Sequence, residues 1–445
     1  MLEIVTVDVH LLFRRLIIML EALVNVPLDL DRGEDDSENF AVVDPSGRLI
    51  LPQKLVKKFG LTPGDQVYME AGEDTLRLHR PVTRPARIYV EPTTRCNMNC
   101  AMCQRHTWNH EPADMHPEVF HRVLDALDHC DPVPSVVFGG FGEPLLHPDI
   151  LSFIRACKKR HAPVELITNG LLLNRERLDD LKRLRLDRLW LSVDGVGDDC
   201  DGHVRDQGAF NRMKGHLKSM FGMTYYSGEM TPGLGFVFVA MKDNIHEFPE
   251  VMKLARSLNV DKIIVSNLLP YTRQGLDQIL YTRSTWEMAG RSFQVKLPRM
   301  DLWGDSVGII LKGLANQDMG EFMGREYQEP MNTCPFLKKA SLSVSQDGRV
   351  SPCPPLLHSH ACFFQGVERK NREHSFGNLK DRKLLDIWND EPYAAFRKRV
   401  KAFDFSPCVS CASCEWAEAN EEDCTGNTFP TCGGCLWAQG LVQCP

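Results

Sequence analysis

Six short apolar runs alternate with segments of helical period through the middle of this 445-residue chain, and this alternation constrains the fold more than any other feature. The runs cover residues 88–91, 136–139, 164–168, 189–193, 235–241 and 263–267. Segments such as HPEVFHRVLDALDHC lie between them, with apolar residues every three or four positions. Because right-handed βα crossovers bring the C-terminal ends of all strands to one face, we predict an α/β fold, a partial (β/α)6 barrel with its active site on that face.

Three cysteines follow the first run in the sequence CNMNCAMC. Cys96, Cys100 and Cys103 form a CxxxCxxC pattern. A four-iron cluster normally takes four thiolates, so three closely spaced ones leave one iron open to another ligand. A structural zinc site and unpaired buried cysteines are the alternatives, but zinc sites usually contain two CxxC pairs and clustered thiols rarely serve only as core. The spacing therefore favours an iron-sulfur cluster.

Glycine-rich and polar segments follow the next three runs at the same predicted face. They are GGFGEP at residues 139–144, TNG at 168–170 and SVDG at 192–195. Glycine has no Cβ to block close approach of a ligand to the backbone, so the first segment can hold a ligand. A tight turn with a buried glutamate is the structural alternative. Together, the four strand ends predict one composite site.

The cysteine triplet and the glycine-rich segment resemble the radical S-adenosylmethionine (SAM) superfamily. The resemblance implies a [4Fe-4S] cluster on Cys96, Cys100 and Cys103, whose open iron is chelated by the amino and carboxylate groups of SAM. In the implied reaction, the reduced cluster passes one electron to SAM, and the resulting 5′-deoxyadenosyl radical takes a hydrogen atom from the substrate. The residues that the resemblance places at SAM are Gly139, Gly140, Gly142, Glu143, Asn169, Ser192, Asp194 and Arg205.

The resemblance also implies roles for these residues. The glycines would hold the amino group of SAM, and Glu143 would fix their loop. Ser192 and Asp194 would contact its methionine or ribose part, since an aspartate accepts two hydrogen bonds from ribose hydroxyls. Arg205 would pair with the SAM carboxylate. Asn169 either contacts the cofactor or caps the following helix. No acid, base or hydrogen donor is identified.

Ten of the sixteen cysteines lie after residue 330. With the segments FGN, IW and FR at residues 376–378, 387–388 and 396–397, this region resembles the SPASM extension of peptide- and protein-modifying radical SAM enzymes. The resemblance implies two auxiliary [4Fe-4S] clusters, although the spacing around Cys414 departs from the usual pattern, so the assignment of thiolates to clusters stays open and zinc at one position is an alternative. The expected ligands, which leave out Cys362, are Cys334, Cys353, Cys408, Cys411, Cys414, Cys424, Cys432, Cys435 and Cys444.

The remaining cysteines and the N-terminal part complete the expected organisation. Cys130, Cys157 and Cys200 have no metal-like spacing and are interpreted as ordinary buried or surface thiols. Residues 39–82 resemble the AbrB/SpoVT swapped-hairpin family in their "GR-I-LP" and "LTPGD" segments, which implies a dimerisation or docking module or DNA binding. A plain β-hairpin cap on the next domain is the alternative. The expected parts are a helix and acidic linker at 1–38, this module at 39–82, the barrel at 86–272, a connection at 273–330 and the SPASM-like domain at 331–445.

Charge, hydrophobicity and cysteine usage restrict the partners and the compartment that we expect for this chain. A net charge of −7 argues against a dominant role in nucleic-acid binding, because phosphate contacts need a basic surface. Residues 11–28 are apolar but contain Arg14, Arg15 and Glu21, so we expect an amphipathic helix and no membrane anchor. Clustered cysteines without a secretory signal predict metal ligation in a reducing, anaerobic cytoplasm.

Three hypotheses for function follow. The tail NEEDCTGNTFPTCGGCLWAQGLVQCP and the order of the segments resemble radical SAM/SPASM maturases of tungsten-containing aldehyde oxidoreductases, which implies that oxidoreductase or its pterin cofactor as partner. A maturase of a peptide or a sulfatase-like protein is the second hypothesis, and an AbrB-type DNA-binding redox regulator is the third. For an enzyme we also expect a ferredoxin- or flavodoxin-type reductant, and a homodimer through residues 39–82.

Overall fold

The computed structural model describes residues 40–58, 61, 68–71, 76–79, 84–108, 111–196, 214–215, 217, 232–281, 294–296, 309, 332–364, 367–406, 408–410 and 414–445. The chain divides into two compact units, residues 1–65 and 66–445. The predicted helix at 11–28, the acidic linker, Arg205, Cys200 and Cys411 lie outside the described residues.

One ten-stranded sheet organises the larger unit, in the order β11-β10-β9-β8-β7-β6-β5-β12-β13-β16. Every neighbouring pair from β11 to β12 is parallel, which confirms the α/β fold with a large parallel sheet. The six predicted runs form β5 (Arg87–Val90), β6 (Ser135–Phe138), β7 (Val164–Thr168), β8 (Arg188–Ser192), β9 (Gly233–Ala240) and β10 (Lys262–Asn267). The others are β11 (Gln294–Lys296), β12 (Ser341–Val344), β13 (Arg349–Ser351) and β16 (Gly377–Asn378).

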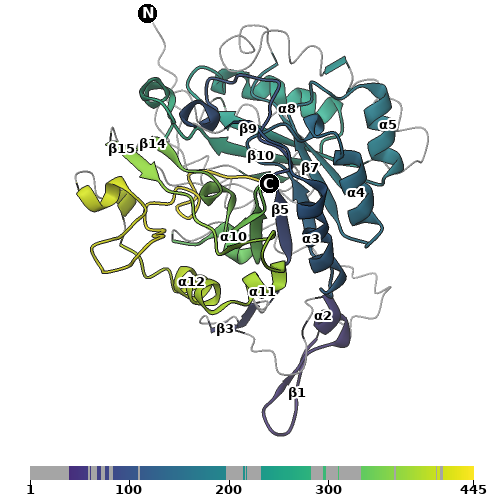
Figure 1. Ribbon diagram of the computed structural model, residues 1–445, viewed down its shortest axis with the longest axis vertical. Helices are drawn as coiled ribbons and strands as arrows, with labels where there is room; N and C mark the ends of the chain where they lie inside the picture. Colours follow the sequence, from purple (N-terminus) through teal and green to yellow (C-terminus); the bar gives the residue numbers. More distant parts are fainter. Residues whose placement is uncertain are drawn as a thin grey trace, which may run out of the picture. The chain divides into compact units, whose positions relative to one another are not determined.

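Amphipathic helices connect the parallel strands and cover the sheet (Figure 1): α3 (Pro117–Asp128), α4 (Ile150–Lys158), α5 (Arg175–Arg183) and α8 (Phe248–Ser257). Helix α3 begins with a proline, whose missing N–H would have no partner in the first turn of a helix. Its buried face carries Phe120, Val123 and Leu127 at helical spacing. The Phe120 ring stacks on Phe153 of α4 with centroids 4.0 Å apart. These contacts hold the helices together over the sheet. The C-terminal ends of the strands, where the sequence predicts the site, are not part of this packing.

The C-terminal region continues the same sheet. Strand β12 pairs in parallel with β5, and Ser343 lies opposite Tyr89. The aromatic core of this region is built from the segments noted in the sequence, because Phe376 stacks on Tyr393 at 4.3 Å and the Arg397 guanidinium lies 4.1 Å from the ring centroid of Trp388. Its other elements are α10 (Pro335–Lys338), the hairpin of β14 (His360–Phe364) and β15 (Val367–Asn371), α11 (Leu384–Trp388) and α12 (Glu391–Ala402).

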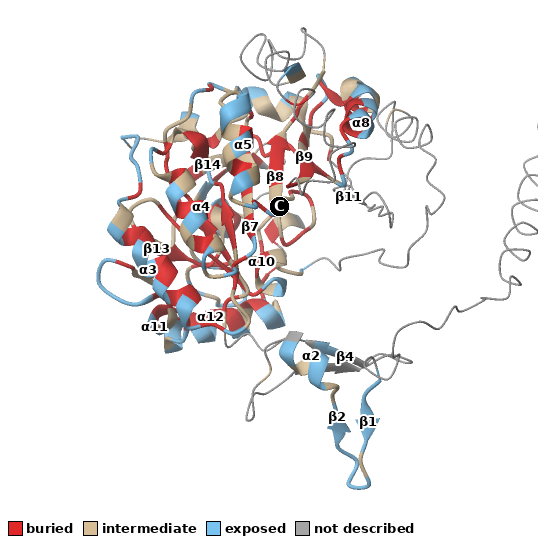
Figure 2. Ribbon diagram, turned by 90° about the vertical axis from the view of Figure 1, so that its right-hand side faces the viewer, coloured by how far each residue is buried: buried red, intermediate tan, exposed pale blue. Residues whose placement is uncertain are grey.

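The N-terminal part contains two short hairpins. Strands β1 (Val42–Val43) and β2 (Leu49–Ile50) pair antiparallel, followed by α2 (Gln53–Lys58); β3 (Tyr68–Ala71) pairs antiparallel with β4 (Leu76–His79). In the turn between β1 and β2, the Asp44 carboxylate accepts hydrogen bonds from the N–H groups of Ser46 and Arg48, both 2.8 Å long. Figure 2 shows β1 and β2 in the exposed colour, and their apolar side chains face solvent. No helix within the described ranges has the length and apolar content needed to cross a bilayer.

Candidate active site and cofactor sites

The cysteine triplet, Cys96, Cys100 and Cys103, lies in a tight loop between β5 and the 3-10 helix η2 (Gln104–Thr107). The Cys103 N–H donates to the Cys100 carbonyl over 3.0 Å, and the ring of His106 bonds to the same carbonyl over 2.9 Å. All three thiols are partly exposed, and none forms a disulfide. Burial raises the pKa of the Cys96 thiol. The loop thus presents three cysteines outside disulfides at the C-terminal end of β5, as the sequence predicts.

The glycine loop, residues 139–144 after β6, packs directly on the triplet loop. The Glu143 N–H donates to the Arg95 carbonyl over 2.8 Å. A Cβ on Gly142 would lie 2.1 Å from the Thr93 carbonyl oxygen, which no rearrangement of a side chain could relieve. Gly140 has φ +123°, a conformation that favours glycine. The two loops therefore meet backbone to backbone, and only glycine fits at the junction.

Glu143 connects the glycine loop to the end of β7. Its side chain is buried, and one carboxylate oxygen accepts from the Leu145 N–H at 3.1 Å and from the Thr168 hydroxyl at 2.7 Å. The other oxygen accepts from the Asn169 N–H at 2.8 Å. Burial raises the pKa of this carboxyl, against the lowering effect of these three donors. Glu143 thus connects the glycine loop to the segment at the end of β7 by hydrogen bonds.

Asn169 lies beside the triplet. Its Nδ2 is 3.9 Å from the Cys96 Sγ and donates to the Asn97 side chain at 2.8 Å. The helix that follows, α5, is capped by Asn174, whose side chain accepts from the Arg177 N–H. Capping of the helix by Asn169 is therefore wrong, and a role of Asn169 at the cofactor stays a prediction.

Ser192 and Asp194 occupy the end of β8. Asp194 is buried, and its carboxylate accepts from the Val239 N–H on β9 at 2.8 Å, while its carbonyl accepts from the Asn244 side chain at 3.1 Å. Asp194 thus fixes the ends of β8 and β9 together. Contact of Ser192, which is partly buried, or of Asp194 with SAM remains a prediction.

Four C-terminal thiols gather around one cavity that also contacts Phe336 and Tyr393. We call them the buried thiol set: Cys334, Cys353, Cys432 and Cys435. Burial raises the pKa of each, to about 12 for Cys334; other members of the set raise the pKa of Cys334, Cys353 and Cys432 further, and Cys444 raises that of Cys435. No three Cys, His, Asp or Glu side chains in the described ranges could hold a single metal ion. Thiolates of a four-iron cluster each bind a different iron, so the convergence of four thiols suits a cluster.

A second group of cysteines follows α12. The outer thiol set comprises Cys408, Cys411, Cys414 and Cys424, of which Cys411 lies outside the described residues. Ser406 links two members, because its carbonyl accepts from the Cys408 N–H at 2.7 Å and its hydroxyl lies 3.0 Å from the Cys424 Sγ. These contacts place two of the expected ligands around one serine.

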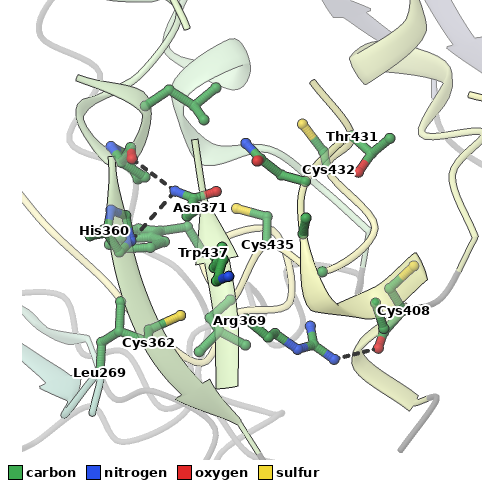
Figure 3. A pocket seen from close by; sticks show the side chains of 18 of the residues that line it. Leu269, His360, Cys362, Arg369, Asn371, Cys408, Thr431, Cys432, Cys435 and Trp437 are labelled. Atoms are coloured by element: carbon green, nitrogen blue, oxygen red, sulfur yellow. Dashed lines mark hydrogen bonds between the residues drawn. The ribbon is translucent and has the colours of Figure 1, made fainter. Parts of the chain in front are cut away.

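Figure 3 shows a larger cavity, which is lined by Cys353, Cys432 and Cys435 of the buried set and by Cys408 of the outer set. Cys362 on β14 also lines this cavity, although its sequence spacing gave no sign of it. Arg369 is buried there and donates to the Cys408 carbonyl at 2.7 Å. Cys130 and Cys157 are buried, which confirms their interpretation as ordinary core cysteines.

The segment after Cys435 packs against the inner side of the barrel strands. The Asn267 side chain donates to the Leu441 carbonyl at 2.9 Å, and the Gln443 N–H donates to the Ser266 hydroxyl at 3.0 Å. The Tyr89 hydroxyl donates to the carbonyl of Pro445. Cys444 packs in the same cluster as Tyr89, so this ninth expected ligand lies near the buried thiol set.

Two buried polar residues at the site have no motif of their own. Glu91 follows β5 directly, and His358 lies between α10 and β14; their side chains contact each other and the glycine loop. The position of Glu91 at a strand end could have indicated that it belongs to the site, whereas nothing in the sequence indicated His358.

Comparison with known proteins agrees with this geometry. The radical SAM superfamily model matches residues 90–273, and the SPASM iron-sulfur cluster-binding domain model matches residues 334–415. The tungsten-containing aldehyde ferredoxin oxidoreductase cofactor-modifying protein of Pyrococcus furiosus is 30% identical over 374 residues, which cover 80% of this chain and 96% of that protein. The PqqA peptide cyclase of Gluconobacter oxydans is 26% identical, over 78% of this chain and 90% of the cyclase.

Among solved structures, Streptococcus suis SuiB bound to S-adenosylmethionine superposes with a TM-score of 0.51 at 17% identity, covering 74% of this chain and 71% of SuiB. This likeness shows the fold. The strand-end loops, the clustered thiols and these matches together show that the chain belongs to the radical SAM family with a SPASM domain that includes the tungsten oxidoreductase cofactor-modifying protein.

Proposed function

We propose that this radical SAM enzyme matures a tungsten-containing oxidoreductase or its pterin cofactor. The observation that carries the proposal is the similarity to the Pyrococcus furiosus cofactor-modifying protein, which extends over 96% of that protein's length. Nearly the whole length of that protein therefore has a counterpart in this chain.

The residues at the barrel face fit a [4Fe-4S] cluster and SAM. The triplet offers three thiols on one loop, none of them in a disulfide, and the glycine loop lies against it where any side chain on Gly142 would collide with backbone. Cys96, Cys100 and Cys103 would hold the cluster, and the glycine loop would hold the amino group of SAM. When bound, the reduced cluster supplies an electron that cleaves SAM to a 5′-deoxyadenosyl radical. The protein's part is to fix these loops, which the Glu143 hydrogen bonds do.

We assign the two thiol sets to two auxiliary clusters. The buried thiol set lines one cavity and its members influence one another electrostatically, which supports a shared cluster. The outer thiol set, of which Cys408 and Cys424 contact Ser406, would hold the other. Metal binding requires thiolates, so a cluster must overcome the raised pKa of the buried thiols. Cys444 and Cys362 are left as thiols beside the clusters.

The exposed hairpin supports a protein partner for the N-terminal part. Val42, Val43 and Ile50 on the paired strands, and Phe40 just before β1, are between 54% and 69% exposed in the described residues, which is unusual for neighbouring apolar side chains. We propose that this surface binds a second copy or the substrate protein, which would raise the local concentration of substrate at the barrel. A reductant of the ferredoxin or flavodoxin type, in an anaerobic cytoplasm, completes the proposal.

A peptide maturase is the second candidate function, because the PqqA peptide cyclases are also similar to this chain. The two candidates differ in substrate and share the radical chemistry. A DNA-binding regulator would not need a SAM-binding site at the strand ends, so the regulator hypothesis is not favoured.

The test compares three strains that carry the intact gene, a gene lacking residues 1–82, or no gene. Oxidoreductase activity at equal oxidoreductase level should be high in the first, reduced in the second and lost in the third, while the truncated protein keeps substrate-free SAM cleavage in vitro. Full oxidoreductase activity without the gene would overturn the tungsten assignment. Transfer of deuterium from a labelled precursor peptide to 5′-deoxyadenosine would then establish the peptide maturase.

A further inference from the structure

A buried contact between a histidine and a glutamate joins the SPASM domain to the radical SAM domain. The Nε2 of His358 lies 2.6 Å from one carboxylate oxygen of Glu91, and the two residues are 267 positions apart in the chain. The Glu91 side chain is fully buried and that of His358 is 2% exposed. A carboxylate removed from water needs hydrogen-bond partners, and breaking such a buried pair is far more disruptive than breaking a surface one.

Glu91 is also the support of the glycine loop. Its second carboxylate oxygen accepts from the Phe141 N–H at 3.1 Å. Gly140 packs so closely that a Cβ there would lie 2.7 Å from the Glu91 Cγ. The position of the Glu91 side chain therefore determines where the backbone of residues 140–141 lies, and His358 holds that side chain from the other side.

The His358 ring also contacts the segment that follows the triplet. The Trp108 ring lies 4.2 Å from it, centroid to centroid, at an angle of 37°. Phe141 completes the group, edge-on to Trp108 at 5.2 Å and to His358 at 5.8 Å. The imidazole of His358 thus contacts the glycine loop in two ways, directly at Phe141 and indirectly through Glu91. It also contacts Trp108 at the end of η2.

We propose that His358 is a positioning residue: it does not touch SAM but, through its hydrogen bond to Glu91, it sets the conformation in which the glycine loop binds SAM. The inference rests on the proposed role of the glycine loop. It gives the SPASM domain a second task besides holding clusters, which is to complete the cofactor site of the barrel. His358 follows Cys353 of the buried thiol set by five residues, so the folding of that region around its cluster would also place the imidazole.

Two substitutions separate the hydrogen bond from the packing. His358→Phe keeps an aromatic ring beside Trp108 but cannot donate to Glu91. His358→Gln loses the ring but retains an amide N–H that can reach the carboxylate. The matched control is His374→Phe, because His374 is another SPASM-domain histidine packed edge-on between aromatic rings, Phe376 at 4.6 Å and Phe429 at 4.9 Å.

The measurements are the dissociation constant of SAM and the electron paramagnetic resonance spectrum of the reduced triplet cluster with and without SAM, on reconstituted full-length protein. We expect His358→Phe to raise the dissociation constant at least tenfold and to weaken the SAM-induced spectral change, with wild-type iron content. His358→Gln should remain within about threefold of wild type, and His374→Phe should match wild type. If His358→Phe loses iron, His358→Leu replaces it with the same expectation.

Wild-type SAM affinity in His358→Phe, or equal losses in His358→Phe and His358→Gln, would overturn the positioning role. Failure of the proposed cofactor site looks different: the wild-type protein itself would then show no SAM-induced spectral change, whatever the variants do.

Discussion

Replacing Glu143 by glutamine should loosen the junction between the loops that follow β6 and β7. In Glu143→Gln one carboxylate oxygen becomes an NH2 group, which donates and cannot accept. One oxygen of Glu143 serves two donors, Leu145 and Thr168, and the other serves only Asn169. The less disruptive orientation therefore points the NH2 group at the Asn169 N–H, where two donors face each other.

The size of the effect follows from this geometry. The Asn169 N–H and the new NH2 group then both lack an acceptor, and each buried N–H without one costs about 1–3 kcal/mol. Because burial raises the pKa of Glu143, removing its charge offsets part of that cost, and we expect a net loss of about 2 kcal/mol at the loop junction. At a factor of ten for each 1.4 kcal/mol, this corresponds to about 30-fold more frequent local opening.

Hydrogen–deuterium exchange of the peptide that contains residues 169–171 measures this opening directly. Exchange there should accelerate about 30-fold in Glu143→Gln. The control is Glu165→Gln, also on the β7 side of the barrel, whose carboxylate bonds to Arg87 at 2.7 Å and to Trp190 at 2.6 Å. Unchanged exchange at residues 169–171 in Glu143→Gln would refute the assignment of Glu143 as the link between the loops.

Three further predictions concern the metal sites and pH. Replacing the whole triplet by alanine should abolish cleavage of SAM, assayed as 5′-deoxyadenosine, and leave the C-terminal iron bound; undiminished cleavage would contradict the site. Iron analysis should give about 12 atoms per chain, and about 4 fewer when the buried thiol set is replaced by serine, whereas about 4 atoms with stoichiometric zinc would exclude auxiliary clusters. Burial lowers the pKa of His360 to about 4, so the stability gained from its neutral form is present above pH 6.5 and lost as pH falls toward 4. Between pH 7.5 and 5.5, urea denaturation should show wild type losing about 1 kcal/mol more than His360→Gln, and equal losses would show that His360 is not titrating.

Much of the barrel could be predicted because its information is local. Each strand of the parallel sheet is a short apolar run, and each motif follows its strand directly, so the common orientation of strand ends was enough to bring the triplet, the glycine loop and Asn169 together. The structure adds what fixes them: Glu143 and Glu91 are held by partners on other loops, and a single sequence gives no signal for pairs of this kind.

The C-terminal region was less predictable, because its contacts join distant parts of the chain. The spacing of the cysteines suggested ligands but not which ones share a cavity, since Cys334 and Cys432 come together only through folding. Cys362 lines the larger cavity although it has no metal-like spacing. The sequence also gave no indication that β12 would pair with β5, because parallel pairing across such a separation leaves no local pattern.

The pairing of β12 with β5 has a consequence for how the two domains can be separated. Strand β5 is an inner strand only because β12 covers it, and its Ile88 and Val90 are almost completely buried. A fragment that stops at the end of the barrel would turn β5 into an open edge, whose unpaired amide and carbonyl groups are a template for association with other chains. A barrel that lost the SPASM domain, by truncation or by gene rearrangement, would therefore expose this edge to other chains unless another element covered it.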